Sequence, residues 1–326
     1  MKRTIFLIFS LLHLTSGFGQ GIASSFSVLR LPTSTHVAAL GGENISLATD
    51  DAPATGFSNP ALYAGVEPRT LGLQFMTMPD GGSHFGAQYV HDFGDRHTAA
   101  LTASCLNYGT MDETDLQGIK SGTFSPKDIC VGLGYSYLLS DHFSGGANLK
   151  FVSSSYGQYN SLALAVDLGL NYYDPENDIS LSAALLHIGR QVKTFEDGER
   201  QHLPFNAIIG GTIGLSHAPV RISVTLSDLT RWKSKDYFTA GKKLSFGRIA
   251  ANHVTVGVDL LLSDAITISA GYNARRAYEL KQAGGSHWAG LSGGLNLAFR
   301  RVKIGLSYSR YALSASSLNV NAAYTF

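Results

Sequence analysis

The stretch LALAVDLGLNY, residues 162–172, decides the fold, because its large apolar side chains fall at every second position. Leu, Val and Tyr occupy the even positions, whereas Ala, Asp, Gly and Asn occupy the odd ones. A period of two is typical of a β-strand, whose successive side chains point to opposite faces, and does not fit a helix. The segment therefore predicts a strand with one apolar face and one face of small or polar residues.

The same alternation recurs from residue 70 to the C-terminus, for example in VTVGVDL (254–260) and VKIGLSYS (302–309). The non-apolar faces hold mostly Gly, Ser, Ala, Asn and Thr, whereas a soluble β-sandwich would expose charged residues there. Such a face suits the wet interior of a transmembrane barrel, and single-chain outer-membrane barrels have an even number of strands. We predict an all-β, fourteen-stranded antiparallel barrel with strands at 70–78, 83–91, 97–107, 128–139, 143–156, 161–173, 179–189, 205–216, 219–227, 252–262, 265–273, 287–299, 302–311 and 317–326.

Connection lengths support this strand count. The long connections, at 108–127, 190–204, 228–251 and 274–286, all follow odd-numbered strands, and every connection after an even-numbered strand is a short turn. Outer-membrane barrels have short periplasmic turns and longer outer loops. We therefore expect the four long segments to face the cell surface.

Composition excludes several other classes of protein. Only 15% of the 326 residues are charged and the net charge is +1, which argues against nucleic acid as a partner. Past residue 19 no apolar run of about 18 residues occurs, which excludes a helical membrane protein. The His residues lack metal-ligand spacing and no catalytic motif stands in its required context, so we expect no enzyme activity, no metal and no cofactor.

The chain divides into three parts. Residues 1–19 have a basic start, an apolar stretch and small residues near Gly19, which predicts a secretory signal peptide; a permanent anchor would need about 20 apolar residues. Residues 20–69 do not alternate, and Ser34 or Thr35 could cap a short helix that stops at Gly41. Because a barrel of this size has a wide lumen, we expect 20–69 to be a hatch inside the barrel of residues 70–326.

The run LPTSTHVAALGGENIS (31–46), followed by Asp50-Asp51 and Asn59-Pro60-Ala61-Leu62, resembles the N-terminal region of the PorV/PorQ family, relatives of the fatty-acid-transporter barrels. Within that family SGTFS (121–125), GGANLK (145–150) and residues 161–172 are similar to the PorQ branch. The last strand ends on Tyr324 and Phe326, which looks like the signal that barrel-assembly machinery reads.

The resemblance implies a non-catalytic outer-membrane component of the type IX secretion system. Such a protein anchors a large extracellular (PorZ-like) subunit of the attachment complex at the cell surface. That subunit acts with a sortase-like protease and its own barrel partner, which link cargo to lipopolysaccharide. The alternative is an outer-membrane transporter of hydrophobic compounds of the fatty-acid-transporter type, although small polar lumenal residues and short outer loops do not favour oily ligands.

Candidate contact residues gather in the long loops. Segment 228–251 has a positive excess with interleaved aromatic residues, which fits either an acidic partner or lipopolysaccharide phosphates, or simply a solvated loop. The residues that we expect to bind a partner are Arg231, Trp232, Lys233, Tyr237, Arg275 and Arg276.

The two cysteines flank the 108–127 loop at equal distances from its midpoint. With a symmetric antiparallel register, Cys105 and Cys130 would lie opposite each other and form a disulfide. The alternative is a pair of free thiols.

Overall fold

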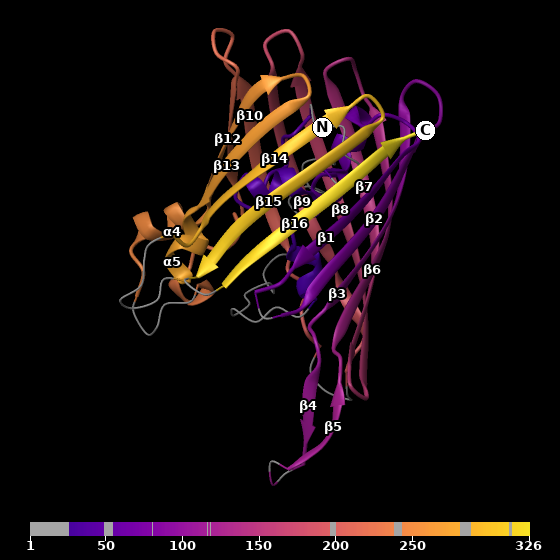
Figure 1. Ribbon diagram of the computed structural model, residues 1–326, viewed down its shortest axis with the longest axis vertical. Helices are drawn as coiled ribbons and strands as arrows, with labels where there is room; N and C mark the ends of the chain where they lie inside the picture. Colours follow the sequence, from indigo (N-terminus) through magenta and orange to yellow (C-terminus); the bar gives the residue numbers. More distant parts are fainter. Residues whose placement is uncertain are drawn as a thin grey trace, which may run out of the picture.

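A computed structural model describes residues 26–48, 55–79, 81–115, 117, 119–195, 200–237, 243–280, 288–312 and 315–326. Fourteen antiparallel strands form one closed barrel, in which each strand pairs with its neighbours along the chain and β1 pairs with β16 to close the ring (Figure 1). The predicted signal peptide and the Asp50-Asp51 pair lie outside the described residues. No helix in the described ranges is long and apolar enough to cross a membrane.

The barrel strands alternate as the sequence predicts. They are β1 Thr70–Thr77, β2 Ser83–Asp92, β3 His97–Asn107, β6 Lys127–Leu138, β7 Phe143–Tyr156, β8 Tyr159–Asp174, β9 Ile179–Lys193, β10 Asn206–Gly214, β11 Val220–Leu226, β12 Val254–Ser263, β13 Ile266–Asn273, β14 Leu291–Phe299, β15 Val302–Ala312 and β16 Ala315–Thr325. On β8, Leu168 and Leu170 are exposed on the outer face, whereas Asp167 and Asn171 are buried on the lumenal face. The outer face is therefore apolar and the lumenal face polar, as expected for a barrel in lipid.

The two ends of the barrel differ. Tight turns join the strands at one end, the short-turn end, while the long connections emerge at the other, the loop end (Figure 1). Three segments that the sequence suggested to be loops contain regular structure. Residues 108–127 form a hairpin of β4 (Met111–Thr114) and β5 (Lys120–Phe124), and the other two contain η3 (Ser234–Asp236), α4 (Phe246–Asn252) and α5 (Ala274–Glu279).

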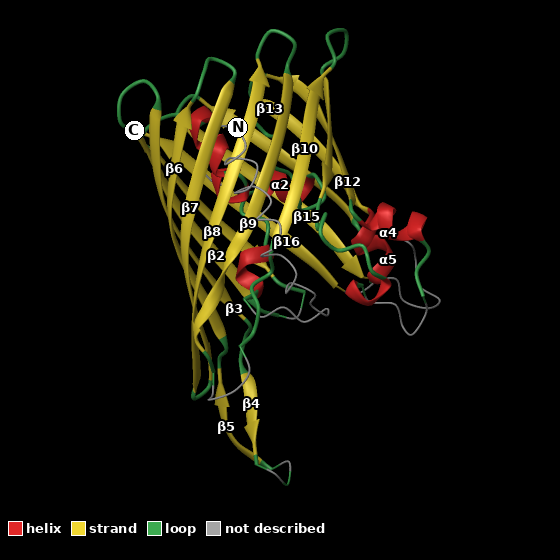
Figure 2. Ribbon diagram, turned by 180° about the vertical axis from the view of Figure 1, so that it is seen from behind, coloured by secondary structure: helices red, strands yellow, loops and turns green. Residues whose placement is uncertain are grey.

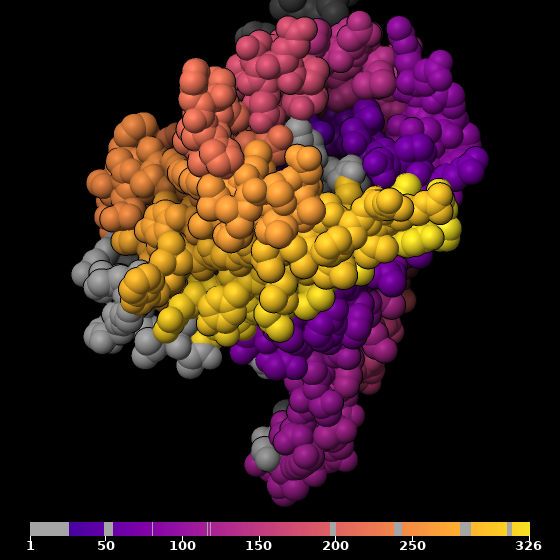
Figure 3. Space-filling model, turned by 45° about the horizontal axis from the view of Figure 1, so that its top comes forward, coloured from indigo at the N-terminus to yellow at the C-terminus, as the bar shows by residue number. Residues whose placement is uncertain are grey.

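The N-terminal hatch lies inside the barrel, as predicted (Figure 2). It consists of η1 (Ser27–Arg30), α2 (Thr35–Ala39), α3 (Thr55–Ser58) and η2 (Pro60–Gly65). The Ser34 hydroxyl accepts the Val37 backbone N–H at 2.9 Å and caps α2, and Gly41 follows with a φ of 102°. Both features confirm the expected short helix. With the short-turn end brought forward, the indigo hatch is visible within the ring of strands (Figure 3).

Glycines on the lumenal face let the hatch approach the wall closely. A Cβ on Gly146 would lie 2.5 Å from the Pro60 carbonyl group, and one on Gly271 would meet the backbone that follows α2. Side chains cannot occupy such positions, so glycine is required by close backbone approach. The wall glycines at which an added Cβ would meet backbone or side-chain atoms of the hatch are Gly134, Gly146 and Gly169 around η2, and Gly257, Gly271, Gly294 and Gly305 around α2.

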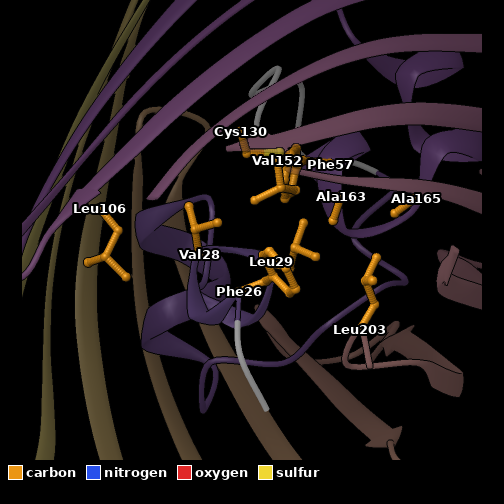
Figure 4. Packing of buried hydrophobic residues seen from close by; sticks show 10 residues of the cluster. All are labelled: Phe26, Val28, Leu29, Phe57, Leu106, Cys130, Val152, Ala163, Ala165 and Leu203. Atoms are coloured by element: carbon orange, nitrogen blue, oxygen red, sulfur yellow. The ribbon is translucent and has the colours of Figure 1, made fainter. Parts of the chain in front are cut away.

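An apolar cluster joins the hatch to the wall (Figure 4). From the hatch come Phe26, Val28, Leu29 and Phe57, and wall strands contribute small or branched side chains that include Val152. All of these side chains are at most 5% exposed. Burial of such side chains stabilises the hatch by about 1.5–3 kcal/mol for each large residue.

The prediction of a disulfide between Cys105 and Cys130 is wrong. Cys105 pairs across the strands with Ile129, and Cys130 pairs with Ser104, so the register is offset by one residue from the symmetric one. An offset of one residue puts the two side chains on opposite faces of the sheet. Cys105 accordingly lies on the outer face and Cys130 is buried on the lumenal face, and both are free.

The fit between hatch and wall can be tested at two adjacent glycines of β7. In Gly146→Ala the new methyl group collides with Pro60, so we expect a loss of about 1–3 kcal/mol of unfolding free energy, as for overpacked cores. In the control, Gly145→Ala, the methyl group lies 3.4 Å from Leu139 and Leu170, and we expect a change within about 0.5 kcal/mol. Urea unfolding in lipid vesicles measures both. Equal stability of the two variants would contradict the proposed fit.

Candidate functional site

One buried carboxylate at the loop end holds three segments together. Asp228 follows β11 and receives guanidinium groups from the hatch, from its own loop and from α5. Arg30 Nη2 lies 3.3 Å from Oδ1, Arg231 Nε lies 3.5 Å from the same oxygen, and Arg275 Nη1 contacts Oδ2. The backbone of Asp228 has a φ of 53°, and its N–H donates to Asn206 Oδ1 at 2.7 Å. The hatch is thus ion-paired to the loop end.

Aromatic and imidazole groups pack around this ion cluster. The hydroxyl group of Tyr237, which is 2% exposed, donates to the Arg231 carbonyl at 2.7 Å and lies 3.2 Å from His253 Nε2. Arg275 lies over the Tyr237 ring, 5.2 Å from its centroid, and its Nε also pairs with Glu279 at 3.0 Å. These contacts hold Tyr237 between Arg231, His253 and Arg275.

The charges set the protonation of Asp228. Burial alone would raise the pKa of this carboxyl group, but attraction to Arg30, Arg231 and Arg275 outweighs burial and lowers the pKa below its usual value. A carboxylate with a lowered pKa contributes stability above its ordinary pKa of about 3.9 and loses that contribution as the pH falls through the lowered value. The Asp228 carboxyl group is therefore ionised at neutral pH.

A second charged contact joins the hatch to the middle of the wall. Lys150 is 1% exposed, and its Nζ lies 2.6 Å from Asp167 Oδ2. The same Nζ donates a hydrogen bond of 3.3 Å to the Phe57 carbonyl of the hatch. The same ammonium group stands 3.4 Å above the Phe57 ring. The other oxygen of Asp167 accepts the His187 backbone N–H at 2.7 Å.

The hydrogen bond from the His187 N–H to Asp167 lies at a β-bulge in the wall. Between β8 and β9 the pairing passes from Val166–Ile188 to Leu168–Leu185, so two β9 residues lie opposite Asp167. His187 is one of them and has a φ of 58°, and its N–H is left without a ladder partner. Because the Asp167 carboxylate accepts this N–H, the bulge stays closed. Asp167 also pairs with Lys150, which contacts the hatch.

The six predicted contact residues divide into two groups. Trp232 is 43% exposed and Lys233 is also exposed, so both can meet a partner. Arg231 and Tyr237 are buried, and Arg275 pairs inward with Asp228. Arg276 is half-buried and lies over the Tyr311 ring. Partner binding by this set stays a prediction, and only the first two present their side chains to it.

The β4–β5 hairpin presents a second surface at the loop end. It extends well beyond the barrel (Figure 1), and every residue of β4 is exposed. Met111 is 44% and Ile119 is 66% exposed, while the Lys120–Asp112 ion pair at 2.6 Å links the two strands. Large apolar side chains on an isolated hairpin are typical of an interaction site.

Sequence reasoning missed the residues that hold the hatch. Asp228 and Lys150 are charged residues that contact the hatch, and Asp167 pairs with Lys150; none of the three was singled out for this role. One signal was present, since Lys150 and Asp167 are charged residues at lumenal positions that are otherwise small or neutral. Within the described ranges, no group of three or more His, Cys, Asp or Glu residues is arranged to hold a metal ion.

Comparison with known proteins defines the fold. No known family model matches the sequence, and no curated protein matches it either. Among solved structures, the toluene transporter TodX of Pseudomonas putida superimposes with a TM-score of 0.56 at 13% identity, covering 90% of this chain and 98% of that one.

Two further barrels are similar. A FadL homologue of Pseudomonas aeruginosa has a TM-score of 0.52 at 13% identity and covers 94% of this chain and 100% of its own. The CymD monoaromatic hydrocarbon channel has a TM-score of 0.55 at 12% identity and covers 93% and 99%. The structural neighbours are thus outer-membrane hydrocarbon-transporter barrels of the FadL type rather than enzymes. At these identities the likeness shows the fold of this chain alone, a closed antiparallel β-barrel.

The ion cluster gives a pH-dependent prediction. In Asp228→Asn three arginines lose their carboxylate, and breaking a buried pair costs ~3–5 kcal/mol, less where the arginines are partly exposed. We expect the protection of hatch amides 26–48 against hydrogen exchange to fall by about 30-fold at pH 7, which corresponds to ~2 kcal/mol.

Wild-type protein should lose the same protection as the pH falls from the ordinary aspartate pKa of about 3.9 through the lowered pKa of Asp228, where its carboxylate becomes protonated. The exposed turn residue Asp264, replaced by Asn, is the control. Unchanged hatch protection in Asp228→Asn would contradict the role assigned to the cluster.

Proposed function

We propose that this chain is a non-catalytic outer-membrane scaffold whose loop end faces the cell surface and holds an extracellular partner. The observation that carries the proposal is the closed hatch, which is joined to the loop end by the Arg30–Asp228 ion pair, to β7 by the hydrogen bond from Lys150 to the Phe57 carbonyl, and to other strands by further hydrogen bonds. Ser292 and Ser144 of the wall donate to hatch carbonyls at 2.7 and 2.9 Å. A barrel filled in this way is a rigid base for surface structures.

The finer proposal names the partner. The resemblance of residues 31–46, 121–125 and 145–150 to the PorV/PorQ family supports a place in the type IX secretion system. The partner would be the large extracellular subunit of the attachment complex, which in turn meets a sortase-like protease and its barrel partner. The β4–β5 hairpin is the surface that we assign to this contact, because it stands clear of the barrel and exposes Met111 and Ile119.

The likeness of fold favours a second candidate, a transporter of hydrophobic compounds. TodX is described as a toluene transporter and CymD as a monoaromatic hydrocarbon channel, and both share this architecture. Between hatch and wall a cavity of about 70 Å³ is lined by Leu29, Pro32 and Ile208 among others. Ligand pockets usually measure about 300–1,000 Å³, so a hydrocarbon would fit into this cavity only if the hatch moved.

One experiment separates the two candidates. Residues 111–124 are replaced by a short Gly-Ser turn, which removes the hairpin but leaves the barrel strands and the hatch intact. The control is Phe93→Ala, which removes an exposed aromatic residue at the short-turn end. Both proteins are expressed in the native outer membrane, extracted in mild detergent and captured through a tag, and bound proteins are identified by mass spectrometry.

We expect the control to retain a large extracellular subunit and the hairpin variant to lose it by at least about tenfold, which is the effect of removing a contact worth ~1.4 kcal/mol. Retention of the subunit without the hairpin would overturn the assignment of this surface. A barrel that is recovered alone with a hydrocarbon or acyl ligand in its lumen would overturn the scaffold and support the transporter.

A further inference from the structure

Two short helices stand beside the barrel rather than above it. In both ribbon views α4 and α5 project sideways at the loop end, whereas the β4–β5 hairpin continues beyond the barrel (Figures 1 and 2). α4 packs against α5, and α5 contacts β12 and β13. The pair therefore lies next to the rim where the apolar outer face of these strands ends.

The outer surface of α4 and of the preceding loop carries exposed aromatic and basic residues. We call this surface the shelf and define it as Trp232, Lys233, Lys235, Phe246 and Arg248. The rings of Trp232 and Phe246 are stacked, with centroids 5.8 Å apart and planes at 21°. They remain 43% and 74% exposed, although burial of such rings is favourable. An apolar environment on the outside of the shelf would complete their burial.

The shelf lies beside the loop ends of β12 and β13, whose outer face is apolar. The Trp232 ring lies 4.4 Å from the ring of His253, the residue that directly precedes β12. At the same end of β13, Tyr272 points outward and is 44% exposed. Aromatic residues at the ends of barrel strands typically form the girdle at the level of the lipid headgroups. The Trp232–Phe246 pair thus lies beside this girdle of aromatic residues.

The charges of the shelf point away from the protein. Lys233, Lys235 and Arg248 are exposed, and in the described part of the chain no carboxylate lies within ion-pair distance of them. By contrast, Arg231 and Arg275 turn inward to Asp228. Arg248 lies 4.5 Å from the centroid of the Tyr278 ring, which holds its side chain on the shelf. Three exposed cations beside two exposed rings fit an anionic partner with an apolar layer.

We propose that the shelf is a lipid-docking site on the outer leaflet. Trp232 and Phe246 enter the interface between headgroups and acyl chains, and Lys233, Lys235 and Arg248 bind the phosphate groups of the lipid headgroups. Interfacial helices combine Trp and Phe on one face with Lys and Arg on the other for the same reason. The sideways position favours lipid over a protein above the membrane. The proposal needs only the barrel and is independent of the partner suggested above.

Tryptophan fluorescence tests the apolar half of the site. The chain has two tryptophans, so Trp288→Phe leaves Trp232 as the only reporter. The full chain is placed in phosphatidylcholine vesicles with phosphatidylglycerol or lipid A, in which some acyl chains are brominated near the headgroup. We expect Trp232 to be quenched by the brominated lipid and to be shielded from aqueous iodide. Quenching by iodide but not by brominated lipid would overturn the proposal.

Charge variants test the other half. The variant Lys233→Gln/Lys235→Gln/Arg248→Gln removes the three charges. In the parent protein we expect brominated phosphatidylglycerol to quench Trp232 more strongly than brominated phosphatidylcholine does. The ratio of the two quenching efficiencies should fall by up to about fivefold for each charge removed. Arg300→Gln/Arg301→Gln, an exposed pair at the short-turn end, is the matched control and should leave the preference unchanged.

Added inorganic phosphate distinguishes a lipid headgroup from a free anion. If millimolar phosphate abolishes the lipid preference, the site binds the free ion and the lipid assignment fails. If Trp232 becomes shielded only when the extracellular subunit is added, the shelf is a protein contact and the proposal is wrong.

Discussion

The close fit between the hatch and the lumenal wall is the constraint on which the rest of the structure depends. A fourteen-stranded barrel encloses a lumen that side chains alone fill poorly. In this protein the hatch fills the lumen with its backbone as well as its side chains. Gly146 and Gly271 let η2 and α2 approach the strands to contact distance. Many of the other lumenal side chains are small or hydrogen-bonding, and Ser144 and Ser292 donate to hatch carbonyls that would otherwise be buried without partners.

Charges then fix the orientation of the hatch. Asp228 draws Arg30 from inside the barrel and Arg275 from α5 to one point, so the loop end and the hatch share a single ion cluster. Lys150 ties Phe57 to Asp167, which also closes the bulge at His187. Movement of the hatch would separate Arg30 from Asp228 and would remove the Phe57 carbonyl from the buried Lys150 ammonium group. This cost favours a stationary hatch.

Much of the fold was predictable from the sequence, because alternation with a period of two is a local property. The number of strands, the separation of apolar and polar side chains on the two faces of β8, and the short helix capped by Ser34 all follow from residues that are close together in the sequence. The functional geometry was less accessible. The register between Cys105 and Cys130 differs by one residue from the symmetric expectation, and the partners of Asp228 come from segments about 200 residues apart, such as Arg30. Such pairings depend on the closure of the barrel, which no local pattern encodes.

A stationary hatch is the central claim, and a reversible lock tests it most directly. The Ser46 and Thr212 hydroxyl oxygens lie 2.8 Å apart, one on the hatch and one on β10, so Ser46→Cys/Thr212→Cys in a background with both native cysteines replaced can form a disulfide. Uptake of a hydrocarbon into vesicles and capture of the extracellular subunit are measured with the lock oxidised and reduced. The account predicts no change in either. Uptake that appears on reduction and disappears on oxidation would show a moving hatch and contradict it.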